Sequence, residues 1–390
     1  MKKVLLVMAA LLCIGSVAFA QQDGFKATGM VFSSLAYDVD NEAWGGSEMT
    51  VDDETYSFLY YTRFGMTWNR GNLGMEMSFN VVEGYDVGDR SKESNPFLYA
   101  AWGSSKWFDN ILMVKVGMVR DTTYNSGGKI NTRGGEGSGV MVRIRPFEKL
   151  DNKKYGTLDF GGGVYVPAGG GPLEIVKLSG GFNYQLDKVF KWVASYSVED
   201  KEFARFTTGL HLLAVDNLRL SLETVMRPII LGDEHPMIIF DEVISYRMDK
   251  WTFGIDMYQF LNNGQIYARK GILAPFNNTM IQPNEVARLG LSFDPNVSYR
   301  INQTLTAKLG FTGESYGYKS YNAMGKEKVD EIMAFSVRPS FQIRMGMAGQ
   351  IEMGYKYQAY KVTTELDGVE YGSAVKGHSN KIDMVCIMYF

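Results

Sequence analysis

The stretch from Phe58 to Val81 reads FLYYTRFGMTWNRGNLGMEMSFNV and contains two runs in which the side chains alternate in character. In the first run, up to Trp68, mostly aromatic and apolar residues alternate with a set that includes Arg63, glycine and threonine. The second run alternates Leu, Met, Phe and Val with Gly, Glu, Ser and Asn, and the turn Asn69–Asn72 separates the two. Successive side chains of a strand point to opposite faces of a sheet. We therefore predict a hairpin of two strands of about ten residues, each with an oily face and a polar face.

The same alternation recurs along the chain, in segments 182–198, 206–226, 305–312 and 333–344. A soluble β-sandwich alternates in the same way, so the pattern alone does not separate a sandwich from a transmembrane barrel. Strand length favours the barrel. About ten residues let a tilted strand cross a bilayer, whereas soluble strands average about five or six.

The connections between the predicted strands alternate between short and long. Short connections fall near 69–72, 186–189, 216–217, 248–250, 301–303 and 345–347, and long ones near 38–55, 83–95, 120–138, 261–284, 316–331 and 361–379. Aromatic residues gather at the predicted strand ends: Trp68, Trp107, Trp192, Trp251, Tyr299, Tyr355, Tyr357 and Tyr389. Both features are typical of barrels with tight periplasmic turns, long outer loops and aromatic girdles at the headgroup level.

The first twenty residues have the features of a cleavable signal peptide. Lys2 and Lys3 precede the apolar segment 4–17, and Ala18–Ala20 supplies a small-x-small cleavage site. We expect residues 1–20 to be removed and residues 21–390 to form one domain. That domain holds a single cysteine, Cys386, and no apolar run of the roughly 18 residues that a spanning helix needs.

The end of the chain carries the most specific signal. Lys381–Phe390 reads KIDMVCIMYF, a ten-residue alternating strand that stops at an aromatic residue. It resembles the terminal strand of outer-membrane β-barrel proteins of diderm bacteria, of porin-like type. The resemblance implies that the protein lies in the outer membrane, in contact with its lipid. It also implies that the barrel-assembly machinery recognises this strand, with Phe390 as the assembly signal.

Together these features predict an all-β fold, a single transmembrane antiparallel up-and-down barrel of sixteen to eighteen strands. We count eighteen, although the segments 26–37, 97–103 and 238–247 alternate poorly. In the last of these, one parity turns Asp241 toward lipid and the other turns Glu242 there. We expect a bulge or a misplaced strand at that point.

The face predicted to line the lumen collects charge. Fifteen basic residues fall on it: Arg63, Lys115, Arg143, Arg145, Lys177, Lys191, Arg205, Arg219, Arg227, Arg288, Lys308, Arg338, Arg344, Lys356 and Lys381. Eight acidic residues share it: Glu76, Asp159, Glu199, Glu223, Asp256, Glu314, Glu352 and Asp383. A barrel of this size is too wide for side chains to fill, so we expect water inside it.

A wet, charged lumen predicts a diffusion pore for small polar or anionic solutes. For any single residue the alternative is cross-strand pairing that only keeps the wall hydrated. In the loop 120–138, Lys129, Arg133 and Glu136 are candidates for a constriction; the alternative is a solvated surface loop. For the whole protein the alternative is a surface binder whose long loops capture host or environmental ligands. Porins commonly form homotrimers, but no strand here stands out as an interface.

Catalytic and cofactor motifs are scarce. His211 shares the lumen parity with Ser221, but serines are too frequent for this pair to predict a hydrolase. Gly128 and Lys129 are followed by Ile130, which excludes a phosphate-binding P-loop. We therefore predict no enzyme activity, no cofactor and no metal. The formal net charge of −3 gives no basic face for nucleic acid.

Overall fold

The computed structural model describes residues 24–40, 43–45, 49–51, 54–56, 58–85, 92–121, 135–166, 177–198, 204–226, 238–261, 290–321 and 327–389. Antiparallel strands make up almost all of these segments. The strands of the wall are β1 (Phe25–Asp38), β5 (Phe58–Arg70), β6 (Leu73–Tyr85), β7 (Lys92–Trp107), β8 (Leu112–Asp121), β9 (Gly135–Ile144), β10 (Thr157–Val166), β11 (Lys177–Leu186), β12 (Phe190–Val198), β13 (Ala204–Leu212), β14 (Leu218–Met226), β15 (Ile238–Met248), β16 (Trp251–Leu261), β17 (Gly290–Phe293), β18 (Asn296–Arg300), β19 (Leu305–Tyr321), β20 (Glu327–Arg344), β21 (Gly349–Leu366) and β23 (Val375–Tyr389).

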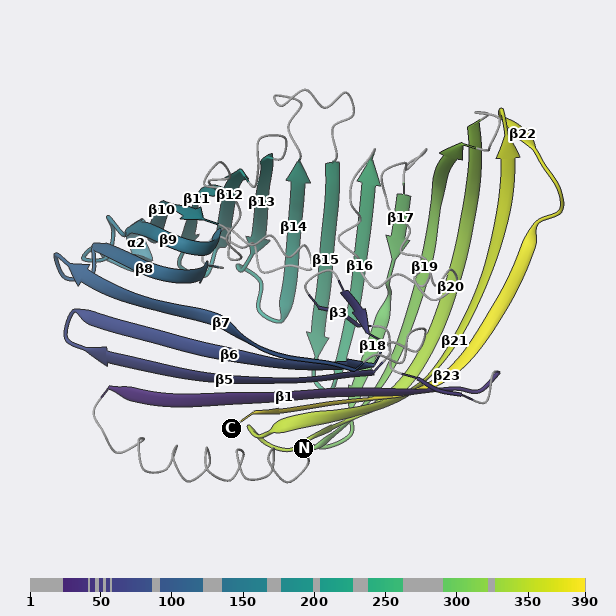
Figure 1. Ribbon diagram of the computed structural model, residues 1–390, viewed down its shortest axis with the longest axis horizontal. Coiled ribbons are helices and arrows are strands. Elements are labelled where there is room, and N and C mark those ends of the chain that lie inside the picture. The colour runs from purple at the N-terminus through teal and green to yellow at the C-terminus, as the bar shows by residue number, and fades with distance from the viewer. Residues whose placement is uncertain are drawn as a thin grey trace.

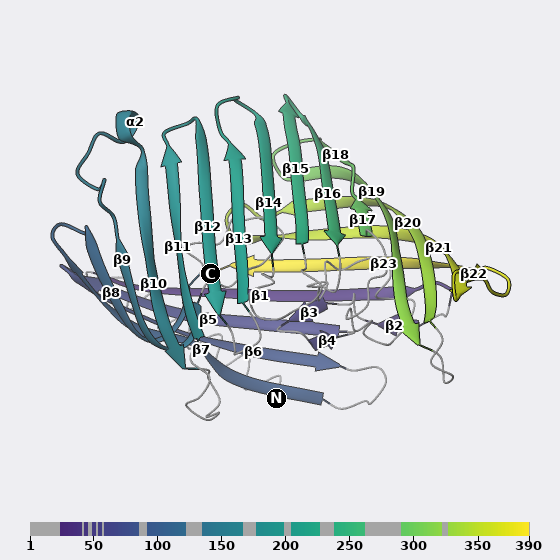
Figure 2. The same cartoon turned by 90° about the horizontal axis from the view of Figure 1, so that it is seen from above.

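Each wall strand pairs with its neighbours in chain order, and β23 returns to pair with β1, which closes the ring. β17 and β18 occupy one wall position, because both pair with β16 on one side and β19 on the other. The wall therefore has eighteen strands, the upper end of the predicted range. In Figure 1 the strands β1, β5 and β6 cross β13 to β16 at a steep angle, and Figure 2 shows the same two walls from above. Closure satisfies the backbone of every strand, which hydrocarbon requires.

Within the described segments, four short strands and one short helix lie in the connections between the wall strands. They are β2 (Ala43–Gly45), β3 (Met49–Val51), β4 (Glu54–Tyr56), β22 (Val369–Glu370) and α2 (Asn152–Tyr155). Tight turns join strands at one end of the barrel, and Asn217, Asp249 and Gly346 there adopt left-handed backbone conformations. Among the residues in the ranges above, no helix is long and apolar enough to cross a membrane.

The weakly alternating segments are regular strands with one exception, and the bulge lies elsewhere than expected. β15 pairs with β14 and β16 without a shift in register, so the bulge or misplaced strand predicted at 238–247 was wrong. The register shift lies in β7, opposite Ser78 and Phe79 of β6, where Tyr99 is the extra residue. A bulge of this kind changes which face later residues occupy, which explains why alternation fades around it.

Two predicted outer loops are largely strand. β19 runs to Tyr321 and β20 begins at Glu327, so most of segment 316–331 is paired; β21 and β23 likewise take up most of 361–379. These strands have 15 to 18 residues, well beyond the length needed to cross a bilayer. The strands extend beyond the predicted boundaries because a hydrogen-bonded hairpin can continue into water, where an alternation between oily and polar side chains is no longer required.

The outer face is apolar along the strands. Large exposed residues there include Val116, Leu210, Leu222, Phe253, Phe341 and Met353. Glu242 of β15 also lies on this face, opposite Leu222 and Met257, while Asp241 faces inward and is buried. Nε2 of Gln259 on β16 donates a hydrogen bond to Glu242 Oε1 at 3.3 Å. The ambiguity at 241–242 is thus resolved by a polar pair on the oily side rather than by a bulge.

Candidate functional site: the lumen wall

The strand registers place the predicted lumen residues on the inward face, opposite the exposed apolar residues. Those whose side chains are described are Arg63, Lys115, Arg143, Arg145, Lys191, Arg219, Glu223, Lys308, Arg338, Arg344 and Lys356. Lys177 and Arg205 lie in β11 and β13 at lumen-facing register positions. Arg227, Arg288, Lys129, Arg133 and Phe390 lie outside the described residues. Glu136 lies in β9 opposite Arg120, so this residue of the predicted constriction loop belongs to a wall strand.

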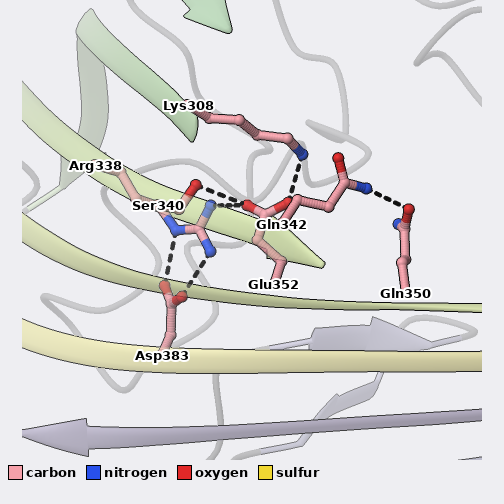
Figure 3. Close-up of polar contacts among 7 residues, drawn as sticks. All are labelled: Lys308, Arg338, Ser340, Gln342, Gln350, Glu352 and Asp383. Carbon is pink, nitrogen blue, oxygen red and sulfur yellow. Dashed lines mark hydrogen bonds and ion pairs between the residues drawn. The ribbon is translucent and has the colours of Figure 1, made fainter. Parts of the chain in front are cut away.

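A network of ion pairs crosses four strands of the wall, from β19 to β23 (Figure 3). Arg338 donates from Nε and Nη2 to the two carboxylate oxygens of Asp383, at 2.9 and 2.6 Å, and from Nη1 to Glu352. Lys308 Nζ lies 2.5 Å from Glu352 Oε2, and Ser340 donates to Glu352 Oε1 at 3.1 Å. The carboxylates of Glu352 and Asp383 are therefore both engaged by cations. We name Lys308, Arg338, Glu352 and Asp383 the Arg338 network.

A glycine makes the longest reach of this network possible. Arg338 belongs to β20 and Asp383 to β23, so the guanidinium must pass over the intervening strand β21. It does so at Gly354, which lies directly opposite Asp383 in the ladder. A Cβ atom at Gly354 would stand 3.1 Å from three guanidinium atoms. The missing side chain therefore gives Arg338 its path across the strand.

Beside the network, two lysines face one another. Lys356 of β21 and Lys381 of β23 are direct partners in the antiparallel ladder, and both are half-buried. Neither ammonium group forms a hydrogen bond or an ion pair within the described part of the chain. We refer to them as the lysine pair.

The wall from β14 to β19 has the opposite character. Its lumen face carries Glu223, Asp241, Asp256, Asp294 and Glu314. The first three are nearly fully buried, at 1%, 0% and 4% exposure. His211 Nε2 lies 3.9 Å from Glu223 Oε1. No group of three or more acidic, histidine or cysteine residues in the described segments is arranged to hold a metal ion. We call these five carboxylates the acidic wall.

A third part of the lumen face, from β7 to β12, is partly apolar. Met141, Tyr165 and Val193 form a buried cluster, each 1% exposed, with Trp102 packed against it. Lys115 Nζ lies 4.3 Å from the centre of the Trp102 ring, a cation–π contact. Nearby, Arg143 pairs with Asp159, and Arg145 Nε approaches the same carboxylate at 3.3 Å. This part of the wall is therefore lined by packed side chains as well as by charges.

Sequence reasoning missed two members of the acidic wall. Asp241 was left undecided between two parities, and Asp294, which precedes Pro295, was not among the predicted lumen residues. The backbone nonetheless continues, since Asp294 and Asp256 exchange hydrogen bonds of 3.3 and 2.7 Å. Proline removes one donor from a ladder but does not shift its register, and this rule could have recovered Asp294.

A closed antiparallel ring with an oily exterior and charges on its inward face is the architecture of an outer-membrane porin. Solved structures with the same fold include OccAB1 of Acinetobacter baumannii, with a TM-score of 0.56 at 10% identity, covering 94% of this chain and 96% of that one. OprD of Pseudomonas aeruginosa has a TM-score of 0.54 at 10% identity and covers 95% and 97%. OccK5 (OpdH) of the same organism has 0.54 at 11% and covers 94% and 99%. No protein-family model matches the sequence, and no curated protein matches it. At these identities the likeness concerns the fold, which is that of a porin-like barrel.

Proposed function

We propose that this protein is an outer-membrane channel through which small polar solutes diffuse passively, with a preference for anions. The observation that carries the proposal is the closed ring with charge on its inward face and oil-compatible side chains on its outer face. Such a ring separates a polar path from lipid, and diffusion through it requires no conformational change. No catalytic role is needed for this function.

The preference for anions rests on differences in exposure around the lumen. Lys308 and Arg338 keep 32% and 27% of their side-chain surface exposed, whereas the carboxylates of Glu223 and Asp241 are almost entirely buried. A solute in the water path therefore meets the cations more directly than the buried acids. Because field strength at a solute depends on distance and on solvent between the charges, the exposed cations should dominate selection.

Three further parts of the proposal concern the cell. Residues 1–20 act as the cleaved export signal, Phe390 is the signal read by the barrel-assembly machinery, and the barrel resides in the outer membrane, where it can associate as a homotrimer. Mass spectrometry of the mature N-terminus tests the first part, and removal of Phe390 tests the second, because insertion should fall while synthesis continues.

Two measurements on the purified, membrane-inserted protein test the channel itself. In liposome swelling with sugars and organic acids of graded size, we expect a size cut-off and faster entry of the acids. In planar bilayers with a salt gradient, we expect the reversal potential of an anion-preferring pore. Correct insertion with neither swelling nor conductance would overturn the proposal and favour the alternative, a surface binder supported by a closed barrel.

A further inference from the structure

The lysine pair is an unusual arrangement for two neighbouring strands. Directly opposed side chains in an antiparallel ladder have their Cβ atoms about 4.5–5.5 Å apart, and like charges there are destabilising. Lys356 and Lys381 occupy such a position on the lumen side. Arg338 adds further positive charge near Lys356, and the acids that attract Lys356 are Asp383 and Glu314.

Two acids close to the lysine pair are already held by other cations. Asp383 accepts both of its hydrogen bonds from Arg338, and Glu352 is held by Arg338, Lys308 and Ser340. The Arg338 network therefore engages Asp383 and Glu352 and leaves the two ammonium groups beside it, with Glu314 as the remaining acid that attracts Lys356. The excess positive charge of the wall is concentrated at the lysine pair.

The side-chain amide of Gln358 is a second, independent feature, and it adds a hydrogen-bond donor close to the lysine pair. Gln358 lies two residues beyond Lys356 on the same face of β21 and is 1% exposed. Its Oε1 accepts a hydrogen bond from Ser379 at 3.2 Å, but its buried Nε2 donates to no acceptor among the residues that the structure describes. A buried amide donor without an acceptor is costly unless a ligand or water completes it.

We propose that Lys356, Lys381 and Gln358 form a binding site for an oxyanion, such as a carboxylate or phosphate group of a permeating solute. One oxyanion between the ammonium groups converts their repulsion into two charge-assisted contacts and can accept from the amide of Gln358. The inference rests on the proposed channel function and deepens it, because it assigns direct binding of the anion to three residues, whereas Lys308 and Arg338 act on a solute only through their field in the lumen.

The first experiment measures block of single-channel potassium chloride current by added acetate or inorganic phosphate. Parent channels should show saturable block. Replacing both lysines, K356M/K381M, should raise the half-blocking concentration about tenfold or more, as expected for the loss of charge-assisted contacts. Block by acetate alone identifies a carboxylate solute, block by phosphate alone a phosphate solute, and block by both the shared oxyanion chemistry. An equal half-blocking concentration in parent and double variant would overturn the proposal.

Matched controls separate local binding from general electrostatics. K191M removes one lumen-facing lysine from β12, across the ring from β21 and β23, and should shift the half-blocking concentration less than K356M does. The variant K356R/K381R keeps the charges and should retain block. If K191M weakens block as much as K356M, the effect is one of overall charge and the site does not exist.

A thermal measurement tests the site even where current cannot be recorded. In detergent, acetate or phosphate should raise the unfolding midpoint of the parent above that in chloride at equal ionic strength, because a ligand that binds only the folded state stabilises it. K356M/K381M should lose this anion-dependent rise. An absent rise in the parent would overturn the site, whereas a folded parent that shows the rise without conductance would overturn only the channel.

Discussion

The basic side of the lumen, from β19 to β23, and the acidic wall, from β14 to β19, differ in how their charges meet solvent. Arg338 and Lys308 remain about a third exposed while they hold Glu352 and Asp383. Glu223, Asp241 and Asp256 are almost fully withdrawn. The comparison teaches that a lumen-facing register position does not by itself make a charge available to a solute. Under the proposed channel function, exposure separates the charges that act on a solute from those that only hold the wall together.

The largest effect should come from removing the centre of the Arg338 network. Arg338→Met leaves Asp383 and part of Glu352 without their cation, and breaking a buried ion pair costs about 3–5 kcal/mol. Because these side chains keep some contact with water, we expect a loss of about 2 kcal/mol in the free energy of unfolding. Urea unfolding in detergent measures it. Arg338→Lys keeps the charge but not the two-donor geometry of the guanidinium, so it should lose less free energy of unfolding. Equal stability of the parent and Arg338→Met would show that the network does not stabilise the fold.

A smaller effect should follow from blocking the path over β21. Gly354→Ala places a Cβ atom 3.1 Å from the guanidinium, so Arg338 must shift, at a cost of about 1 kcal/mol. Gly310→Ala is the matched control, because its Cβ would meet only a backbone oxygen at 3.9 Å. Removing a glycine from a strand otherwise favours folding, so the control should be neutral or slightly more stable. Identical unfolding curves for the two variants would contradict the role given to Gly354.

Neutralising one charge on each side tests the comparison directly. Lys308→Met removes an exposed cation, and we expect about a twofold fall in the ratio of anion to cation permeability. Glu223→Gln removes a buried charge of similar size and should change the ratio less. Reversal potentials in a salt gradient give both numbers. A larger shift for Glu223→Gln would reverse our assignment of selectivity to the exposed side.

The smallest effect on stability is expected for a solvent-exposed ion pair. It serves as the reference against which the contribution of the Arg338 network is compared. Lys149 Nζ lies 2.5 Å from Asp109 between two turns, with both side chains mostly exposed. The hydrogen bond and the charge of Lys149 lower the pKa of Asp109 below its ordinary 3.8. This contribution is present above pH 3.8 and is lost as the pH falls through the lowered pKa. Lys149→Met should leave the unfolding midpoint at pH 7 unchanged; a clear fall would show that exposed pairs matter more here than we infer.

Period-two patterning was sufficient to predict the fold class, because a strand has only two faces and lipid permits one kind of side chain on one of them. The register of the strands places Arg338, Lys308 and Lys356 on the inward face, and their role in a pore stays a prediction. The ring closure between β23 and β1 followed from the same requirement.

Partners and burial could not be predicted from the pattern. The ion pair between Arg338 and Asp383 depends on the registers of β20 and β23 against β21. It also depends on the missing side chain at Gly354 and on an arginine side chain long enough to cross β21. The packed cluster around Tyr165 depends on how apolar side chains from β9, β10 and β12 meet inside the ring. Such features arise from neighbours far apart in sequence, which alternation along one strand does not encode.

The two sides of the last strand have a mechanical consequence. β23 is hydrogen-bonded to β21 from Val375 to Met388, but to β1 only from Lys381 to Tyr389. Arg338 fastens it further on the β21 side through Asp383. If the barrel is opened by force, the β1–β23 pairing should therefore break first, and β23 should remain hydrogen-bonded to β21.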